Sequence, residues 1–532
     1  MTGPPPTLPI EPTADSLSSG EHGAVVWHRR QLRTTDHPAV TAAATNYDTV
    51  LPLFIFDPAF YTDSGLACDA RIQFLHESLT DLQRQYEARG ATLVYGHGNP
   101  IEILSRFVDR GWDIVATADP ASRYGHDRDN SAAQQCDVTF VDGDGLVRNA
   151  DDPREGWSDH VETWLTDDLW TWSPAAVDLP TVSTSITPDR VSAAYDVTPA
   201  KTMVPTGGRE PALSRLEQFT ATISTYPGRI SAPSDAATGT SRLSPYLRFG
   251  CVSVREVYQY ATEHATDPSA VALFVSRLFW NRHYNQKLVD WPGWTKRAVN
   301  PVLEGFHADT YDPELVAAWK HGATGYPMVD ASMRCLEQTG WLNFRMRAMC
   351  ASVFCDLMQQ PWRIGADWFY SHLIDADPAI NYTQFQTQAG VVGVNMERVY
   401  NPRKQVRDTD PDGEFITEWV PELEPLPIEF LDQPEKTPLA IQAECGISIG
   451  NDYPYPVIEY EAARERIYEK IDRVRDRAKR ALRDPVIARR ASLSRRGGTG
   501  GSDTDTDTEA GSDRAEDPAD TVTSQASLDD FN

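Results

Sequence analysis

The chain has 532 residues and a formal net charge of −28, with 77 acidic residues against 49 lysines and arginines. This length gives room for two folded domains, and no apolar run reaches the ~18 residues that span a bilayer. The seven scattered cysteines form no CxxC pair and no cluster at zinc spacing, which excludes the common disulfide frameworks and structural zinc sites. Sparse cysteines and a Pro/Ser-rich amino terminus predict a cytoplasmic protein without a signal peptide.

The acidity is spread along the chain. Residues 501–532 hold ten acidic residues and one arginine, a net of −9, so −19 of the −28 lies elsewhere. Eight of the 49 cationic residues are lysines, which leaves 41 arginines. This general acid excess predicts a halophilic protein from a salt-rich cytoplasm, where salt screens self-repulsion and weakens many contacts with nucleic acids. The alternative is an ordinary acidic protein with a charged tail.

The first part of the chain alternates short apolar runs with amphipathic helices. After an expected disordered leader (1–20), residues 21–150 should form an α/β domain, with strands at 24–27, 51–56, 91–95, 114–117 and 138–141. Helices are predicted between them at 71–89 and 101–110. This alternation predicts a doubly wound parallel five-stranded sheet with ligands at the carboxyl ends of its strands. Because His28, Arg29 and Arg30 follow the first strand in place of a Gly-rich turn, the dinucleotide fingerprint is absent.

The second part of the chain has a helical character. Residues 151–205 lack periodicity, which predicts a long interdomain linker, and residues 206–485 should form an all-helical domain. Its clearest helices are expected at 270–289, 332–358 and 364–374. Residues 486–532 are predicted to be a disordered acidic tail, since this composition buries little apolar surface. The basic segment 470–496 favours a solvated helix face that pairs with the acidic body, with contact to DNA as the alternative.

Residues 325–405 carry the most chemistry. Here Arg345, Arg347, Asp375, Asp377 and Asn381 are interleaved with Trp, Phe, Met and Tyr, so many of these polar groups must lie against an apolar interior. Buried charges are tolerated only when they are paired or bound to a ligand. A large polar ligand inside a helical core is therefore expected. Taken singly, the same residues read as helix caps and surface acids.

A second polar motif opens an amphipathic stretch earlier in the chain. Its residues are Thr240, Ser241, Arg242, Leu243 and Ser244. Hydroxyl groups at a helix start cap free backbone N–H groups, and the same groups bind phosphate. Taken alone, the motif favours a plain helix cap.

In chain order these pieces resemble the photolyase/cryptochrome flavoprotein family. The resemblance is carried by ValValTrpHisArgArg near residue 25, by GlyThrSerArgLeuSerProTyrLeu, by ThrGlyTrpLeu…ArgMetArg and by AspAlaAsp…Asn. It covers roughly residues 24–480 and is class I-like with a divergent lesion pocket. It implies an α/β domain, a long linker and a helical domain that binds FAD. A second antenna chromophore, deazaflavin or folate, would bind near Arg29, Arg30 and residues 123–130, for which a solvated loop is the alternative.

The resemblance also assigns roles to single residues. Arg347 and Asp375 would form a buried ion pair near the isoalloxazine, Asp377 would lie near the flavin and the adenine–ribose edge, and Asn381 would face flavin N5. An amide there can donate or accept as the N5 proton changes. The remaining flavin contacts would be Tyr226, Thr240, Ser241, Arg242, Leu243 and Ser244. Contacts with DNA or lesion would come from Arg229, Arg277, Trp280 and Arg345.

Several positions depart from the family's repair pattern. Trp280 matches one of two lesion-stacking tryptophans, but Thr387 replaces the other, and Arg277 replaces a glutamate that helps to hold the dimer. Phe344 replaces an asparagine, with Asn343 one position earlier. In the photoreduction chain, Phe385 replaces the flavin-proximal tryptophan, Trp362 keeps the middle one, and the distal one falls near Asp309. The residues available for another electron route are Tyr311, Trp368 and Tyr382.

The resemblance leads to an FAD-dependent protein driven by blue light. The expected activity is that of a deoxyribodipyrimidine photolyase, a lyase that repairs pyrimidine dimers in UV-damaged DNA by electron transfer from reduced FAD, with Asn381, Trp280 and Trp362 in catalytic roles. The first alternative is a cryptochrome-like photoreceptor without repair activity. A light-independent flavin electron carrier is the second. The expected protein is a monomer without membrane contact, and its signalling partner is unknown.

Overall fold

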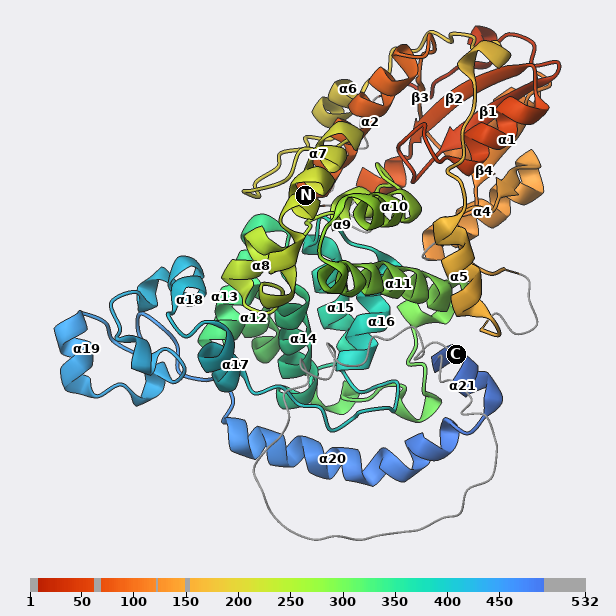
Figure 1. Cartoon of the computed structure of the whole chain (residues 1–532). Helices are drawn as coiled ribbons and strands as arrows, with labels where there is room; N and C mark the ends of the chain where they lie inside the picture. Colours follow the sequence, from red (N-terminus) through yellow and green to blue (C-terminus); the bar gives the residue numbers. More distant parts are fainter. Residues whose placement is uncertain (1–7, 62–67, 121–122, 149–153, 492–532) are drawn as a thin grey trace.

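The computed structural model describes residues 8–61, 68–120, 123–148 and 154–491, and its amino-terminal part contains one five-stranded sheet (Figure 1). Its strands run in the order β3-β2-β1-β4-β5, and every neighbouring pair is parallel. The predicted doubly wound sheet is thereby confirmed. The strands are β1 (Gly23–His28), β2 (Thr49–Phe56), β3 (Val94–His97), β4 (Asp113–Thr117) and β5 (Thr139–Val141).

Four helices cover the two faces of the sheet. They are α1 (Pro38–Asn46), α2 (Asp69–Glu87), α3 (Pro100–Val108) and α4 (Arg123–Cys136). The apolar side chains of α3 and α4 pack on one face, and those of α1 and α2 pack on the other. Because both faces are covered, the middle residues of the strands are mostly apolar, as in parallel strands generally. Residues 123–130, for which a solvated loop was one alternative, form the first turns of α4.

The leader prediction is wrong for residues 8–20. The backbone of Glu11 pairs with that of His97 in β3 through hydrogen bonds of 3.1 and 2.8 Å, and Leu17 is buried in the core under the sheet. Composition does not predict such an ordered segment, because a few backbone hydrogen bonds along a sheet edge are enough to hold it. Residues 1–7 lie outside the described part of the chain.

The connection between the two parts is partly helical, which the sequence reading missed. It contains α5 (Trp157–Thr166) and α6 (Pro188–Ala194). Helix α5 buries Trp157, Val161, Trp164 and Leu165 in the core of the helical part. These four residues have the i, i+4, i+7, i+8 spacing of an amphipathic helix, so the signal was present although short.

The rest of the chain is helical and lies below the sheet domain in Figure 1. Helix α11, predicted at 270–289, and helix α15, predicted at 364–374, are found close to those bounds. The helices are α7 (Arg209–Ala221), α8 (Pro233–Gly239), α9 (Ser244–Arg248), α10 (Val254–His264), α11 (Pro268–Asp290), α12 (Pro313–Lys320), α13 (Pro327–Thr339), α14 (Phe344–Ser352), α15 (Trp362–His372), α16 (Pro378–Gln388), α17 (Pro402–Thr409), α18 (Glu414–Trp419), α19 (Leu439–Cys445), α20 (Tyr460–Ala481) and α21 (Pro485–Ala491).

The single helix predicted at 332–358 is divided into two. Helix α13 ends at Thr339 and is followed by Gly340, which has a left-handed φ of 69°. Helix α14 begins at Phe344 and continues into a π-helical turn at Val353–Leu357. A glycine in this conformation is a common helix terminator, because it carries no Cβ. The break gives α14 a direction of its own and brings its arginines to the cavity described below.

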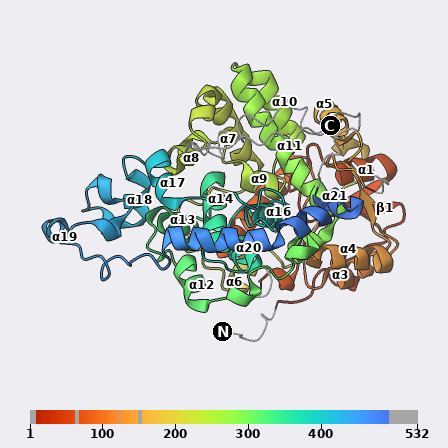
Figure 2. The ribbon, with the colours of Figure 1, turned by 90° about the horizontal axis from the view of Figure 1, so that it is seen from below.

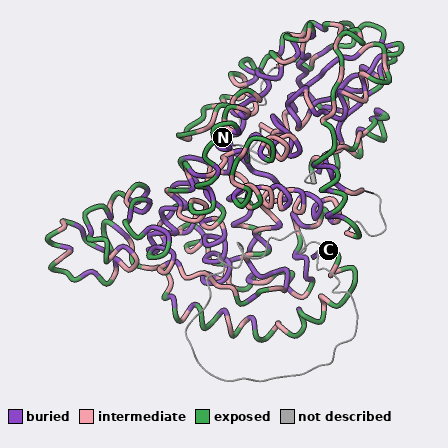
Figure 3. The backbone as a smooth tube through the Cα atoms, in the orientation of Figure 1, coloured by how far each residue is buried: buried purple, intermediate pink, exposed green. Residues whose placement is uncertain are grey.

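Helix α20 packs on the outside of the helical part. Its apolar side faces the core through residues such as Ile467 and Ile471, while its outer side is exposed (Figure 3). Lys470 pairs with Asp309 at 3.0 Å and Arg475 with Asp472 at 2.7 Å. This part of the basic segment therefore pairs with neighbouring acids, one of the two readings that the sequence left open. Figure 2 shows α20 leading directly into α21.

The last helix corrects the predicted tail. Residues 485–491 form α21, and Ala491 is buried against α11. The predicted acidic tail therefore begins later than residue 486, and residues 492–532 lie outside the described part of the chain. None of the helices in the described ranges is long and apolar enough to cross a membrane.

Candidate functional site

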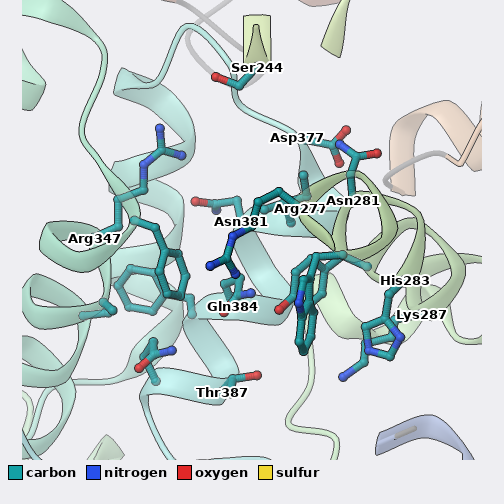
Figure 4. Close-up of a pocket in the computed structure, with 18 of the residues that line it drawn as sticks. Ser244, Arg277, Asn281, His283, Lys287, Arg347, Asp377, Asn381, Gln384 and Thr387 are labelled. Carbon is teal, nitrogen blue, oxygen red and sulfur yellow. The ribbon is translucent and has the colours of Figure 1, made fainter. Parts of the chain in front are cut away.

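A cavity of about 1340 Å³ opens in the helical part, among α9, α11, α14, α16 and α21 (Figure 4). This volume exceeds the roughly 300–1,000 Å³ of ordinary ligand pockets. Its wall is mixed: Leu247, Phe369 and Phe385 are apolar, whereas other lining residues are charged or amidic. Such a lining suits a large ligand that has both flat apolar and polar parts.

Helix α11 lines one side of the cavity. Arg277, Trp280, Asn281 and Tyr284 recur at helical spacing on this side, and the rings of Trp280 and Tyr284 stack with centroids 5.5 Å apart. The side chain of Arg277 points into the cavity toward Asn381 and Gln384 in Figure 4. Burial raises the pKa of Tyr226, which also lines the cavity, although its hydrogen bond with Arg277 lowers it.

Helix α16 forms the opposite side with Asn381, Gln384, Phe385 and Thr387. The amide nitrogen of Asn381 donates to the carbonyl oxygen of Ala366 at 2.9 Å. This bond fixes the orientation of the amide, because a carbonyl only accepts. The Asn381 oxygen is then the atom that remains for a donor on a ligand.

Arg347 of α14 and Asp375 form an ion pair at the cavity wall, as the resemblance implied. The two carboxylate oxygens lie 3.2 and 3.0 Å from Nη2 of Arg347, and Asp375 is 8% exposed. The guanidinium is also fixed by a 2.7 Å bond from Nε to the carbonyl oxygen of Leu342. A buried carboxylate is thus neutralised while it still faces the cavity.

Asp377 has a different partner from the one expected. Its Oδ2 accepts from Nη2 of Arg30 at 3.0 Å, and its Oδ1 caps α16 by accepting from the backbone of Ala379 at 2.8 Å. Burial alone would raise the pKa of Asp377, but Arg30 and Arg248 hold it below its ordinary value. Asp377 lines the cavity, and its carboxylate also holds the start of α16 in place. Its expected role at the adenine–ribose edge stays a prediction.

The 240–244 motif divides in two. Thr240, Ser241 and Ser244 line the cavity. Leu243 does not, because it is buried in the core. Arg242 also lies outside the cavity lining: its guanidinium stacks on Trp341 at 3.8 Å, and burial lowers its pKa to about 10. The expected flavin contacts of Arg242 and Leu243 stay predictions, since neither residue belongs to the cavity lining.

The predicted DNA and electron-transfer residues also divide. Arg277, Trp280 and Arg345 line the cavity, and Arg345 donates to the hydroxyl of Ser231 at 3.1 Å. Arg229 lies outside the lining and donates to Thr238 of α8 at 2.6 Å. Trp362 lies outside the lining and is buried, 7% exposed. The family motifs could not predict which of these residues line the cavity, because a motif gives the order of residues along the chain and not their burial.

The sequence reading missed a basic group at the end of the cavity near α21. Arg154, Lys287 and Arg489 all line it, together with Ala488 and Ala491. Burial and the nearby Arg154 lower the pKa of Lys287 to about 7, whereas Asp290 raises it. Lys287 follows Trp280 by two helical turns, which was a usable signal. Residue 154 and α21 also line the cavity, but they come from distant parts of the chain, so no local sequence pattern predicted their place there.

The proposed antenna region at the strand ends is built from charged pairs. Arg29 forms an ion pair with Asp129 of α4 and lies 3.7 Å from Asp119, and its guanidinium is 5.1 Å from the ring of Trp27. The guanidinium of Arg128 is also 5.1 Å from the ring of Trp27, and it pairs with Asp129 at 2.9 Å. Here the arginines are held by α4 and by the sheet.

The chain matches two family models. The model described as DNA photolyase matches residues 24–151, and that described as FAD binding domain of DNA photolyase matches residues 274–473. The deoxyribodipyrimidine photo-lyase of Halobacterium salinarum is 30% identical over 496 residues, covering 84% of this chain and 98% of the relative. The cryptochrome DASH of Natronomonas pharaonis is 30% identical over 469 residues, covering 82% and 98%. A photolyase structure from Sulfolobus tokodaii with two FAD molecules has a TM-score of 0.72 at 25% identity, covering 85% of this chain and 100% of that one.

The chain therefore belongs to the photolyase/cryptochrome family, whose helical domain binds FAD. The residues present fit this cofactor. The cavity is large, its apolar wall suits a flat ring system, and Ser244 and Arg347 offer polar contacts. In addition, the buried side-chain oxygen of Asn343 at the cavity wall finds no hydrogen-bond partner in the described part of the chain. A ligand with a donor group at this point would supply one.

Proposed function

We propose that the protein is a DNA photolyase that uses FAD and blue light to reverse pyrimidine dimers in UV-damaged DNA. One observation carries the proposal: the residues assigned to the flavin and those assigned to the lesion line one continuous cavity. Arg347, Asp375 and Asn381 belong to the first group, and Arg277 and Trp280 belong to the second. Electron transfer between cofactor and substrate requires this proximity.

Each group has a role that follows from its chemistry. Reduced FAD supplies the electron that opens the dimer and accepts it afterwards. The Asn381 oxygen accepts a hydrogen bond from the reduced ring, since its nitrogen is committed to Ala366. Trp280 stacks on the lesion, which is worth about 1–3 kcal/mol per base. Arg277 places a cation beside the lesion and stabilises the negative charge that the dimer carries after it receives the electron.

The proposal includes the setting of the protein. Acid residues spread over the chain and relatives from Halobacterium salinarum and Natronomonas pharaonis support a halophilic, cytoplasmic protein, and we propose that it acts as a monomer. DNA contact in such a cell depends on stacking and on a few buried cations, because salt weakens contacts with exposed phosphates. The position of Arg277 and Trp280 inside the cavity suits that requirement.

The second candidate function is a cryptochrome-like photoreceptor. Thr387 favours it, because this exposed lining residue offers no ring opposite Trp280 for stacking. Such a protein would keep the flavin and its photoreduction and lose dimer reversal.

One experiment separates the two functions. The purified, chemically reduced protein is mixed at high salt with an oligonucleotide that contains a pyrimidine dimer, and intact thymines are counted after blue light and in the dark. Light-dependent reversal that falls in Trp280→Ala supports the photolyase. Normal flavin photoreduction without reversal leaves the photoreceptor, and a protein without flavin colour contradicts both.

A further inference from the structure

The tryptophan chain of the family is interrupted at two places in this protein. Phe385, a poor electron donor, lines the cavity where the first indole is expected. Asp309, near the place of the last indole, is a surface carboxylate that pairs with Lys470 at 3.0 Å. Of the three tryptophans in the family's chain, this protein keeps the middle one as Trp362, which is buried. At the place of the last indole, Asp309 cannot donate an electron to an oxidised Trp362.

Three aromatic residues are candidates to replace the missing electron donor, and their contacts in the structure differ. Tyr311 is 53% exposed and makes no ring contact with Trp362 among the described residues. Trp368 stacks on His372 at 4.0 Å and lies under Lys320 at 4.8 Å, where a cation disfavours a second positive charge. Tyr382 is in contact with Trp362: the two rings meet edge to face with centroids 6.5 Å apart.

Tyr382 also has a proton acceptor in place. Its hydroxyl donates to Oδ1 of Asp367 at 2.7 Å. The second oxygen of Asp367 lies 3.6 Å from Nε of Arg363, and the carboxylate is half exposed. Burial, together with Asp367, raises the pKa of Tyr382 well above its ordinary value, so the resting phenol keeps its proton. A hydrogen bond of this length lies within the range over which side chains transfer protons.

We propose that Tyr382 is the terminal electron donor when the flavin of this protein is photoreduced, and that Asp367 takes its proton. The inference rests on the proposed function, since it assumes FAD in the cavity. Trp362 loses one electron to the photoexcited oxidised flavin, which is the oxidant. Tyr382 passes one electron to the Trp362 cation, its O–H bond breaks, and the proton forms an O–H bond with Asp367.

The proton transfer from Tyr382 to Asp367 stabilises the charge-separated state. After the step Trp362 is neutral again, Tyr382 is a neutral radical, and the added proton rests on a half-exposed carboxylate beside Arg363. No positive charge remains in the buried chain, so the return of the electron from the flavin is slowed. A soluble thiol then returns one electron and one proton to the Tyr382 oxygen and becomes a thiyl radical.

The test uses the full chain with FAD, blue light and a thiol. Tyr382→Phe removes the donor and should lower the initial rate of flavin photoreduction about tenfold or more, with loss of the tyrosyl radical signal in flash absorption. Asp367→Asn keeps the phenol and removes the base, and it should slow radical formation by about tenfold or more and abolish its slowing in heavy water. Tyr311→Phe is the matched control and should photoreduce as the parent protein does.

Further measurements keep the outcomes separate. Flavin content and the melting temperature are recorded for each variant, and Tyr382→Trp serves if Tyr382→Phe folds poorly; it should photoreduce without a tyrosyl signal. Parent-like photoreduction in Tyr382→Phe overturns the proposal, as does an unchanged heavy-water effect in Asp367→Asn. Dimer reversal by chemically reduced parent protein bypasses Trp362 and Tyr382. Failure of dimer reversal would therefore contradict the proposed function, while the photoreduction rates would still test the role of Tyr382.

Discussion

Nη2 of Arg30 lies 3.0 Å from Oδ2 of Asp377, which joins the loop after the first strand of the sheet to the first turn of α16. The two residues are 347 positions apart in the chain. Asp377 is 5% exposed and caps the helix that carries Asn381. The α/β domain therefore takes part in holding a wall of the flavin cavity.

Replacing Arg30 by Ala should destabilise the protein by about 3–5 kcal/mol, because it leaves the Asp377 carboxylate buried without its partner. The matched variant Arg30→Lys keeps the charge and should lose much less. The free energy of unfolding in urea measures both, and the flavin absorption spectrum reports any shift of α16. Equal stability of Arg30→Ala and the parent protein would contradict a structural role for the pair.

Asp356 should make stability depend on pH in the opposite sense to an ordinary salt-bridged acid. It is 3% exposed, and burial raises its pKa well above 3.8, with the Ser352 hydroxyl only partly opposing this. The folded state therefore holds this proton after the unfolded chain has lost it. The free energy of unfolding should fall as pH rises above about 4 toward the folded pKa.

Asp356→Asn removes this titration and retains a hydrogen-bonding group for Ser352. It should raise stability at neutral pH by about 1–3 kcal/mol and flatten the decline above pH ~4. Denaturant unfolding at several pH values provides the measurement. A variant with the parent's pH slope would show that Asp356 is ionised in the folded protein.

Phe385→Trp should accelerate flavin photoreduction, since an indole would then line the cavity where the family has its flavin-proximal tryptophan. The ring of Phe385 is 4% exposed and meets Phe369 at 5.7 Å, and a Cβ at Gly365 would lie 2.5 Å from it. The larger ring should therefore cost about 1–3 kcal/mol of stability. Photoreduction rates are compared with Phe385→Leu, which supplies no donor; similar rates in the two variants would refute the expectation.

Thr387→Trp should strengthen binding of dimer-containing DNA by about 1–3 kcal/mol. Thr387 is exposed at the cavity wall and its hydroxyl only returns to the carbonyl oxygen of Thr383 at 2.8 Å. The dissociation constants for damaged and intact oligonucleotides are measured at one fixed salt concentration. Thr387→Val is the control of similar size. A gain shared equally by both oligonucleotides would point to general DNA affinity instead of lesion stacking.

The parts predicted well from the sequence were those with local signals. Alternating apolar runs indicated the five strands, and ordered motifs placed Arg347 with Asp375 and Asn381 on the cavity wall. The break at Gly340 was readable as a helix terminator and was overlooked. The pairing of Arg30 with Asp377 and the contribution of α21 to the cavity had no local signal, because they join segments that meet only after the chain has folded.

The antiparallel bridge between Glu11 and His97 bears on whether the protein self-associates through the edge of its sheet. β3 is the outermost strand on its side of the sheet, and an open strand edge is a template for pairing with another chain. The segment around Glu11 occupies part of that edge with two backbone hydrogen bonds. Removal of residues 1–12 should uncover this edge while Leu17 stays in the core under the sheet, and it should make the protein prone to self-association through β3.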